Sequence, residues 1–300
     1  MGFDIKTILL KTLPVILVIF AIAWFLAIRI GNDAQLEIIS LDVDQGDAIL
    51  FRTPENQIAL VDGGPNNKVL QKLGNYLSPL SKRIDIVLLT HPHADHVIGL
   101  VEVLNRYEIG AVVLSGTDLK TDIYSEFLKV VIKKDIPIVI VESGDAIHFS
   151  GNLEFDVLSP EKAEDTVFNK KSEGFGSAGN DVNDTSIVGK LIFNNFSFLL
   201  MGDATYRIEN QLLAYGENLK SDILKVGHHG SKYASTLSFL KFVSPKAAII
   251  EVGAKNRYGH PSPAALSRLK IVDANVFRTD LNGDIKILTD GFITNVYKEK

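Results

Sequence analysis

Apolar and polar residues alternate with two different periods along the chain, and these periods predict strands and helices. Short runs that are apolar at every position or at every second position are typical of strands buried on one or both faces. Such runs occupy 36–42, 47–53, 57–61, 84–89, 111–114, 136–141, 153–158, 186–193, 196–201, 223–226, 247–252, 275–279, 285–289 and 292–297. Helical spacing predicts helices over 68–76, 97–105, 123–134, 206–215, 237–243 and 263–271.

The order of these elements indicates the fold class. Hairpin-like strands come first and strands then alternate with helices, which favours an α/β (α+β) fold of two mixed sheets with helices outside. A polar segment at 159–184, rich in Gly, Ser and Asn, predicts a long loop that is either a lid or a disordered excursion. After the short polar joint "GNDAQ" at 31–35 no further linker is apparent, so we expect two parts, 1–33 and 34–300.

The N-terminal part is dominated by an apolar run. Residues 8–28 are apolar apart from Thr12, Pro14 and the charged Lys11, and they are long enough to cross a bilayer. A cleaved signal peptide is the alternative, because Ala21 and Ala23 form a weak cleavage pattern, but cleavage there would leave an apolar stub. We therefore expect one N-terminal transmembrane helix, and a single-pass membrane protein.

Charge and composition add two restrictions. Lys6 and Lys11 precede the uncharged stretch 12–28 of this run and Arg29 follows it, so the excess of positive charge favours a cytoplasmic N-terminus and an extracytoplasmic main domain. The net charge of −5 provides no global attraction to nucleic acid, so any such contact needs a local basic patch. The absence of cysteine excludes disulfides, thiolate metal sites and a cysteine nucleophile.

Three of the seven histidines fall within six positions in "LLTHPHADHVIGL", residues 88–100. His91, His93 and Asp95 alternate along an extended turn after a strand, and His96 follows at the start of a helix. Imidazole and carboxylate groups are the ligands that zinc, manganese and iron prefer. The pattern therefore predicts a metal site rather than a polar surface turn.

Two further motifs place metal-binding residue types at strand ends. His228 and His229 follow a strand in "ILKVGHHGSK", and Asp203 ends a strand in "FSFLLMGDA". Asp203 is also suited to cap the following helix, but together with the histidines it indicates a ligand. Loops at strand ends of a rigid scaffold commonly build active sites.

These motifs resemble the metallo-β-lactamase superfamily, whose signature is H-x-H-x-D-H after a strand, and more narrowly the hydrolase domain of ComEC-type competence proteins. The stretches that carry the resemblance are "LDVDQGDAILFRTPENQIALVDGG", "LLTHPHADHVIGL", "NDTSIVGKLIFNNFSFLLMGDA", "DILKVGHHGSK" and "NRYGHPSP", in this order over 36–262. The resemblance implies an αββα sandwich. The chain departs from ComEC proteins in having one hydrophobic segment where they have a multi-helix channel.

The resemblance also implies roles for individual residues around two divalent ions, zinc or manganese. His91 and His93 would hold the first ion, with Asp184 a further ligand because the sequence offers Asn183-Asp184 where many members have a histidine. The second ion would be held by Asp95, His96 and His228, and Asp203 would bridge the two. The preference for His228 over His229 rests on the resemblance alone. The catalytic residues expected are Asp95, Asp203 and His229.

Several other positions are expected beside the metals or the substrate. Asp62, in "DGG", would brace the metal loop. Gln45, Gly46 and Asp47 form either a plain hairpin turn or a turn that faces the site. The further candidates for substrate contact are Asn183, Ser231, Arg257 and His260, with Lys225, Lys232 and Lys255 as nearby positive charges.

The function expected from these residues is that of a membrane-anchored, metal-dependent phosphodiesterase or nuclease acting on DNA, related to DNA uptake. Its partners would be the membrane, single-stranded DNA and components of a DNA-uptake channel. Two alternatives remain open: a metal-dependent hydrolase of another small ester or lactam, and a non-catalytic assembly partner in DNA uptake.

Overall fold

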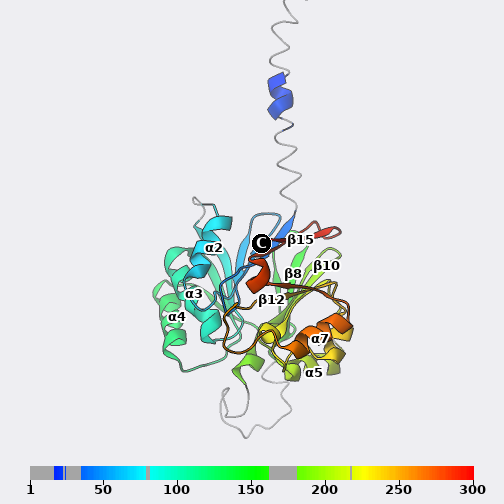
Figure 1. The fold of residues 1–300 in the computed structure, drawn as a ribbon. Helices are drawn as coiled ribbons and strands as arrows, with labels where there is room; N and C mark the ends of the chain where they lie inside the picture. The colour runs from blue at the N-terminus through cyan, green and yellow to red at the C-terminus, as the bar shows by residue number, and fades with distance from the viewer. Residues whose placement is uncertain (1–16, 23, 25–34, 79–81, 162–180, 217) are drawn as a thin grey trace, which may run out of the picture.

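The computed structural model describes residues 17–22, 24, 35–78, 82–161, 181–216 and 218–300. Two sheets face each other and helices cover their outer faces, which confirms the two-sheet fold expected from the sequence (Figure 1). Most of the predicted N-terminal helix and most of the predicted long loop lie outside the described residues. Within the described part, no helix is both long and apolar enough to cross a membrane.

The first sheet has eight strands, of which the four at one side run parallel. Their order is β15 (Thr294–Lys298), β14 (Ile285–Thr289), β1 (Leu36–Ser40), β2 (Ile49–Arg52), β3 (Ile58–Val61), β4 (Arg83–Leu89), β5 (Glu108–Leu114) and β6 (Ile138–Ile140). Helices α2 (Lys68–Tyr76), α3 (Ala94–Arg106) and α4 (Asp122–Lys133) cover its outer face. Strands β3 to β6 run parallel, so their carboxyl ends lie at one end of the molecule.

The second sheet has seven strands. Their order is β13 (Asn275–Arg278), β12 (Ala247–Ile250), β11 (Ile223–Lys225), β10 (Phe196–Leu200), β9 (Val188–Phe193), β8 (Leu153–Ser159) and β7 (Ala146–His148). Its helices are α5 (Tyr206–Ala214), α6 (Leu237–Val243) and α7 (Pro263–Ile271). Short elements are the 3-10 turns η1 (Val182–Thr185) and η2 (Gly227–Gly230) and the helix α8 (Thr279–Asn282). These short elements and β7 were not predicted from the periodicity.

Three apolar layers explain why the strands read as nearly continuous apolar runs. Successive side chains of a strand point to opposite faces, and here both faces are buried. In β1, Ile38 packs in the layer between the sheets and Ile39 packs against the helices of the first sheet. Across the central layer, the Phe51 and Phe198 rings meet edge to face with their centroids 6.4 Å apart.

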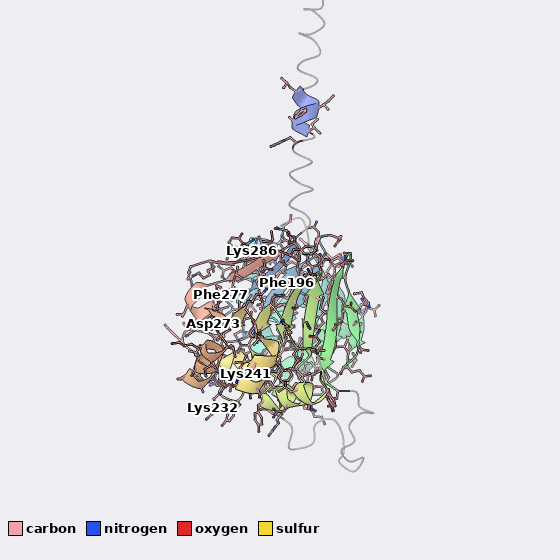
Figure 2. The ribbon with its side chains drawn as sticks, turned by 90° about the vertical axis from the view of Figure 1, so that its right-hand side faces the viewer. Phe196, Lys232, Lys241, Asp273, Phe277 and Lys286 are labelled. Atoms are coloured by element: carbon pink, nitrogen blue, oxygen red, sulfur yellow. The ribbon has the colours of Figure 1, made fainter. Side chains whose placement is uncertain are left out.

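The chain enters the domain at the end opposite the carboxyl ends of the parallel strands. Strand β1 runs antiparallel to β2, and β2 antiparallel to β3, so β1 begins at the amino end of β3 and β4. In Figure 2, Phe196 at the start of β10 lies toward this entry end, and Lys232 beyond β11 lies toward the other. The loops that carry the predicted metal motifs therefore gather at the end away from Leu36.

Candidate metal centre

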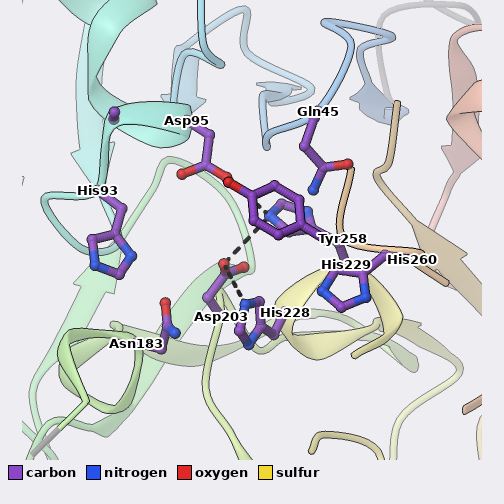
Figure 3. Close-up of a pocket in the computed structure, with 10 residues that line it drawn as sticks. Gln45, His93, Asp95, Asn183, Asp203, His228, His229, Tyr258 and His260 are labelled. Atoms are coloured by element: carbon purple, nitrogen blue, oxygen red, sulfur yellow. Dashed lines mark ion pairs between the residues drawn. The ribbon is translucent and has the colours of Figure 1, made fainter. Parts of the chain in front are cut away.

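Four loops bring the predicted site residues together at the carboxyl ends of the strands. The loop after β4 carries the H-x-H-x-D-H motif, the loop after β10 carries Asp203, the η2 turn after β11 carries His228 and His229, and the turn before β2 carries Asp47. They surround a cavity of about 320 Å³ (Figure 3). Its lining residues are Gln45, His93, Ala94, Asp95, Asn183, Asp203, His228, His229, Tyr258 and His260.

The histidine motif is held by close packing of α3 on the Asp62 loop. Helix α3 begins at Ala94, so Asp95 lies in its first turn, where the partial positive charge of the helix end favours a carboxylate. The Gly99 N–H donates to the Gly64 carbonyl at 3.0 Å. A Cβ at Gly99 would lie 1.9 Å from the Gly63 carbonyl oxygen, so only glycine allows this approach.

Asp62 fixes the orientation of the His96 ring. Its Oδ2 lies 2.8 Å from His96 Nδ1 and accepts a hydrogen bond from the Thr90 hydroxyl at 2.7 Å, and its Oδ1 accepts from the Thr90 N–H at 2.8 Å. A carboxylate on one imidazole nitrogen leaves the other nitrogen available as a metal ligand. The structure thus places Asp62 where a bracing residue is expected.

A backbone carbonyl and a second carboxylate lie beside Nδ1 of His229. His229 Nδ1 lies 2.8 Å from the Glu251 carbonyl oxygen and 3.2 Å from Asp47 Oδ1. The buried ammonium of Lys225 binds the other oxygen of Asp47 and donates to the Gly202 carbonyl. Lys225, expected as a positive charge near the substrate, instead lies beneath the site with 1% of its side chain exposed.

Four side chains converge with the spacing of metal ligands. Asp203 Oδ2 lies 3.4 Å from His96 Nε2 and 3.3 Å from His229 Nε2, and Asp95 Oδ2 lies 3.4 Å from His229 Nε2. Ligand atoms at ~2.1 Å from a tetrahedrally coordinated ion are separated by ~3.4 Å. Both Nε2 atoms and Asp203 Oδ1 are buried, with no hydrogen-bond partner in the described part of the chain. These ligand atoms therefore fit a divalent cation.

A second group of potential ligands includes His91 and His93. His91 Nε2 is 3.1 Å from His93 Nδ1, which suits binding to one ion. His91 also forms a close group with His96 and Asp203, their ligand atoms lying within 4.8 Å of one another. Asp203 therefore belongs to this group as well as to the group of His229, as a bridging carboxylate would.

Asn183 and Asp184 have different surroundings. The Asn183 side chain lines the cavity, and its buried Oδ1 has no hydrogen-bond partner among the described residues. Asp184 Oδ1 accepts hydrogen bonds from the Thr205 N–H and hydroxyl at 3.0 and 2.7 Å, and its Oδ2 pairs with exposed Arg207. The structure does not bring the expected ligand Asp184 to the cavity, because Asp184 stabilises the start of α5.

The acidic and basic groups of the cluster shift one another's pKa. Burial alone would raise the pKa of Asp203, but His229 and His96 hold it well below its usual value. Burial opposes the charge of His96, yet Asp203 and Asp62 raise its pKa well above the ordinary value. His91, in contrast, has its pKa lowered by burial and by His96. The carboxylates of the cluster thus favour positive charge at His96, which is the sign of charge that a bound cation would supply.

The two neighbouring histidines of η2 point in different directions. Both have left-handed backbones, with φ of 45° at His228 and 51° at His229. His229 is buried within the ligand cluster, whereas the His228 side chain is 25% exposed and its Nε2 lies 3.9 Å from Asp203 Oδ2. The structure therefore groups His229 with Asp95 and His96, where the resemblance implied His228.

The remaining candidates form the outer wall. The His260 and Tyr258 rings stack with their centroids 5.8 Å apart, and both residues line the cavity. The exposed Arg257 lies over the Tyr258 ring, with its Cζ 5.3 Å from the ring centroid. The buried Ser231 supports the η2 turn by donating its N–H to His228. Sequence reasoning missed Tyr258, although it lies within the quoted "NRYGHP" motif between two singled-out residues.

Comparisons with known proteins identify the family of this chain. The model of the family described as "Metallo-beta-lactamase superfamily" matches residues 41–253. Bacillus subtilis ComE operon protein 3 is 27% identical over 267 residues, covering 83% of this chain and 32% of that protein. Neisseria gonorrhoeae competence protein ComA is 36% identical over 107 residues, covering 35% and 16%. This chain thus spans about a third or less of these relatives' length.

Solved structures share the fold at low sequence identity. The metallo-beta-lactamase fold protein YhfI from Bacillus subtilis is 14% identical, covering 85% of this chain and 99% of that one with a TM-score of 0.56. Igni18, a metallo hydrolase from Ignicoccus hospitalis, is 12% identical, covering 89% and 100% with a TM-score of 0.51. The resemblance to the hydrolase domain of ComEC-type competence proteins is confirmed by the curated relatives. The chain belongs to the metallo-beta-lactamase superfamily.

Proposed function

We propose that this protein is a two-metal hydrolase that cleaves phosphodiesters in DNA, single strands in preference to duplex. The observation that carries the proposal is that Asp203 belongs to both groups of potential ligands, since its Oδ2 lies 3.3 Å from His229 Nε2 and it forms a close group with His91 and His96. Asp95, His96 and His229 would hold one ion. His91, His93 and Asn183 would hold the other ion, and Asp203 would bind both. Two divalent ions, zinc or manganese, would supply an acidic water and polarise a phosphoryl oxygen.

The protein's own residues would keep this arrangement rigid. Asp62 orients the His96 ring, and the Glu251 carbonyl together with Asp47 lies beside Nδ1 of His229, so that each Nε2 faces the candidate ligand cluster. His228 lines the cavity outside the His229 group, where it would hold a proton near the leaving oxygen. Asp95 and His229, expected as catalytic residues, would act through metal binding.

DNA is favoured as substrate by the relatives and by the cavity's outer wall. Two relatives carry the names competence protein ComA and recombination protein 2. At the cavity mouth the Tyr258 side chain is 56% exposed, and an exposed aromatic ring can stack on the unpaired bases of a single strand. Lys232 and Lys255 would add positive charge at the surface.

The proposal is tested with purified protein loaded with zinc or manganese. We expect labelled single-stranded DNA to be cut faster than duplex, with activity removed by EDTA, reduced by salt and absent in Asp203→Asn. Hydrolysis of simple esters or lactams with DNA left intact would refute the nuclease and support the alternative hydrolase. DNA binding without any hydrolysis by the metallated protein would support an assembly partner instead.

We also propose that residues 8–28 anchor the chain in a membrane with the hydrolase domain outside the cytoplasm. Support comes from the apolar sequence, and from Leu36 lying at the end of the domain opposite the metal centre, so that an anchored domain would turn its cavity away from the bilayer. Protease added to intact cells should digest the domain. Full protection would exclude this orientation, and a mature N-terminus after Ala23 would exclude the anchor.

A further inference from the structure

One buried unpaired atom of the cavity cannot be explained by a metal ion. His96 Nε2, His229 Nε2 and the oxygens of Asp203 and Asn183 carry lone pairs, so a cation can satisfy them. Gln45 Nε2 is also buried and lacks a partner in the described part of the chain, but an amide nitrogen is a donor only. It needs an acceptor atom, and buried donors normally have one.

The Gln45 amide is oriented by its neighbours. The Gly253 N–H donates to Gln45 Oε1 at 3.2 Å, so the opposite amide orientation would set two donors against each other. Gln45 lines the cavity, and Figure 3 shows its nitrogen directed toward the other lining residues. The donor therefore faces the space that a substrate would enter.

Backbone packing holds the turn that carries Gln45. A Cβ at Gly253 would lie 2.7 Å from the backbone nitrogen of Gln45, so the main chain of the loop after β12 contacts the main chain of the turn. A Cβ at Gly46 would lie 2.2 Å from the Asp95 carbonyl oxygen, so the turn also packs on the first turn of α3. The amide donor is thereby held at a constant position relative to the metal ligand Asp95.

We propose that Gln45 is a substrate-binding residue whose amide N–H donates to an anionic, non-bridging phosphoryl oxygen. The identification of this oxygen as phosphoryl rests on the proposed phosphodiesterase function. Donors fixed in advance near developing negative charge stabilise the transition state more than flexible ones. Gln45 would thus share the charge of the scissile phosphate with the two ions.

The test compares three substitutions in the metal-loaded, full-length chain. Gln45→Glu keeps an oxygen for Gly253 but replaces the donor with an acceptor, and Gln45→Met removes the amide without adding charge. Gln71→Glu is the control, because Gln71 is exposed on α2 and does not line the cavity. For each protein we would measure bound metal, the thermal midpoint, kcat/KM for bis(p-nitrophenyl) phosphate, and the Kd of inorganic phosphate.

We expect full metal occupancy and an unchanged thermal midpoint in all variants. Gln45→Met should lower kcat/KM about 10²-fold and weaken phosphate binding about ten-fold, Gln45→Glu should lower both further, and Gln71→Glu should lower neither. Gln45→Met within two-fold of wild type in both measurements would overturn the inference. If wild type cleaves no phosphodiester but binds phosphate through Gln45, the proposed function fails and this inference holds. Wild type that neither cleaves nor binds phosphate would overturn both.

Discussion

Lys225 offers the most direct test of how the metal centre is supported. Its ammonium group is buried, pairs with the carboxylate of Asp47 and donates to the Gly202 carbonyl at 3.1 Å. Burial alone would lower its pKa, but Asp47, Asp203 and Glu251 outweigh burial and raise it. Lys225→Met keeps a side chain of similar length and removes the charge, which leaves Asp47 buried without its cation.

The expected magnitude follows from the burial of both partners. Only 1% of the Lys225 side chain and 3% of the Asp47 side chain are exposed. Removing one partner of a buried pair costs about 3–5 kcal/mol, because the remaining charge has lost its compensation. At about 2–4 °C per kcal/mol, the thermal midpoint should fall by roughly 6–20 °C. The double variant Lys225→Met with Asp47→Asn removes both charges. Its loss of unfolding free energy should be clearly smaller than the sum of the losses in the two single variants.

The assay is urea denaturation in EDTA, so that bound metal does not contribute to the measured stability. Lys241→Met is the control, since Lys241 is exposed on α6. A loss below about 1 kcal/mol for Lys225→Met would refute the reasoning. Strict additivity in the double variant would also refute it, because the two charges would then be shown not to interact.

Three further predictions concern the ligands, the cavity mouth and the packing of α3. His229→Gln should lose about one of two bound ions and His228→Gln should keep both, as measured by metal analysis; the reverse result would assign the ligand to His228. Tyr258→Leu should raise KM for single-stranded DNA about ten-fold but leave cleavage of an abasic strand unchanged, and equal effects on both strands would exclude base stacking. Gly99→Ala should lower the free energy of unfolding by about 1–3 kcal/mol, because the new Cβ would meet the Gly63 carbonyl. Gly74→Ala in α2, where a Cβ would have nothing within 4 Å, should instead raise the free energy of unfolding by about 0.5–1 kcal/mol. Denaturation measurements that fail to separate the two variants would contradict this packing.

The local sequence pattern was sufficient to predict the scaffold and the location of the candidate metal centre. The helices over 68–76, 237–243 and 263–271 are observed with the predicted bounds, because amphipathic spacing and end signals are properties of the segment itself. The short strand β7 was missed because it is exposed apart from the half-buried Ile147, so its sequence "AIH" does not form an apolar run. His91 and Asp203 were singled out as candidate ligands because each lies a few residues after an apolar strand, and strand ends meet at the edge of a sheet.

Only the tertiary structure decided which of two adjacent residues belongs to the candidate ligand cluster. His228 and His229 have the same side chain, and Asn183 and Asp184 both offer an oxygen to a cation, so composition and spacing cannot separate them. The left-handed η2 turn buries His229, and Thr205 and Arg207 occupy the carboxylate of Asp184. Lys225 likewise reads as a substrate-binding charge until Asp47, 178 positions away, is seen to pair with it. Side-chain direction and pairing depend on contacts between segments distant in sequence, and these contacts exist only once the sheets have packed.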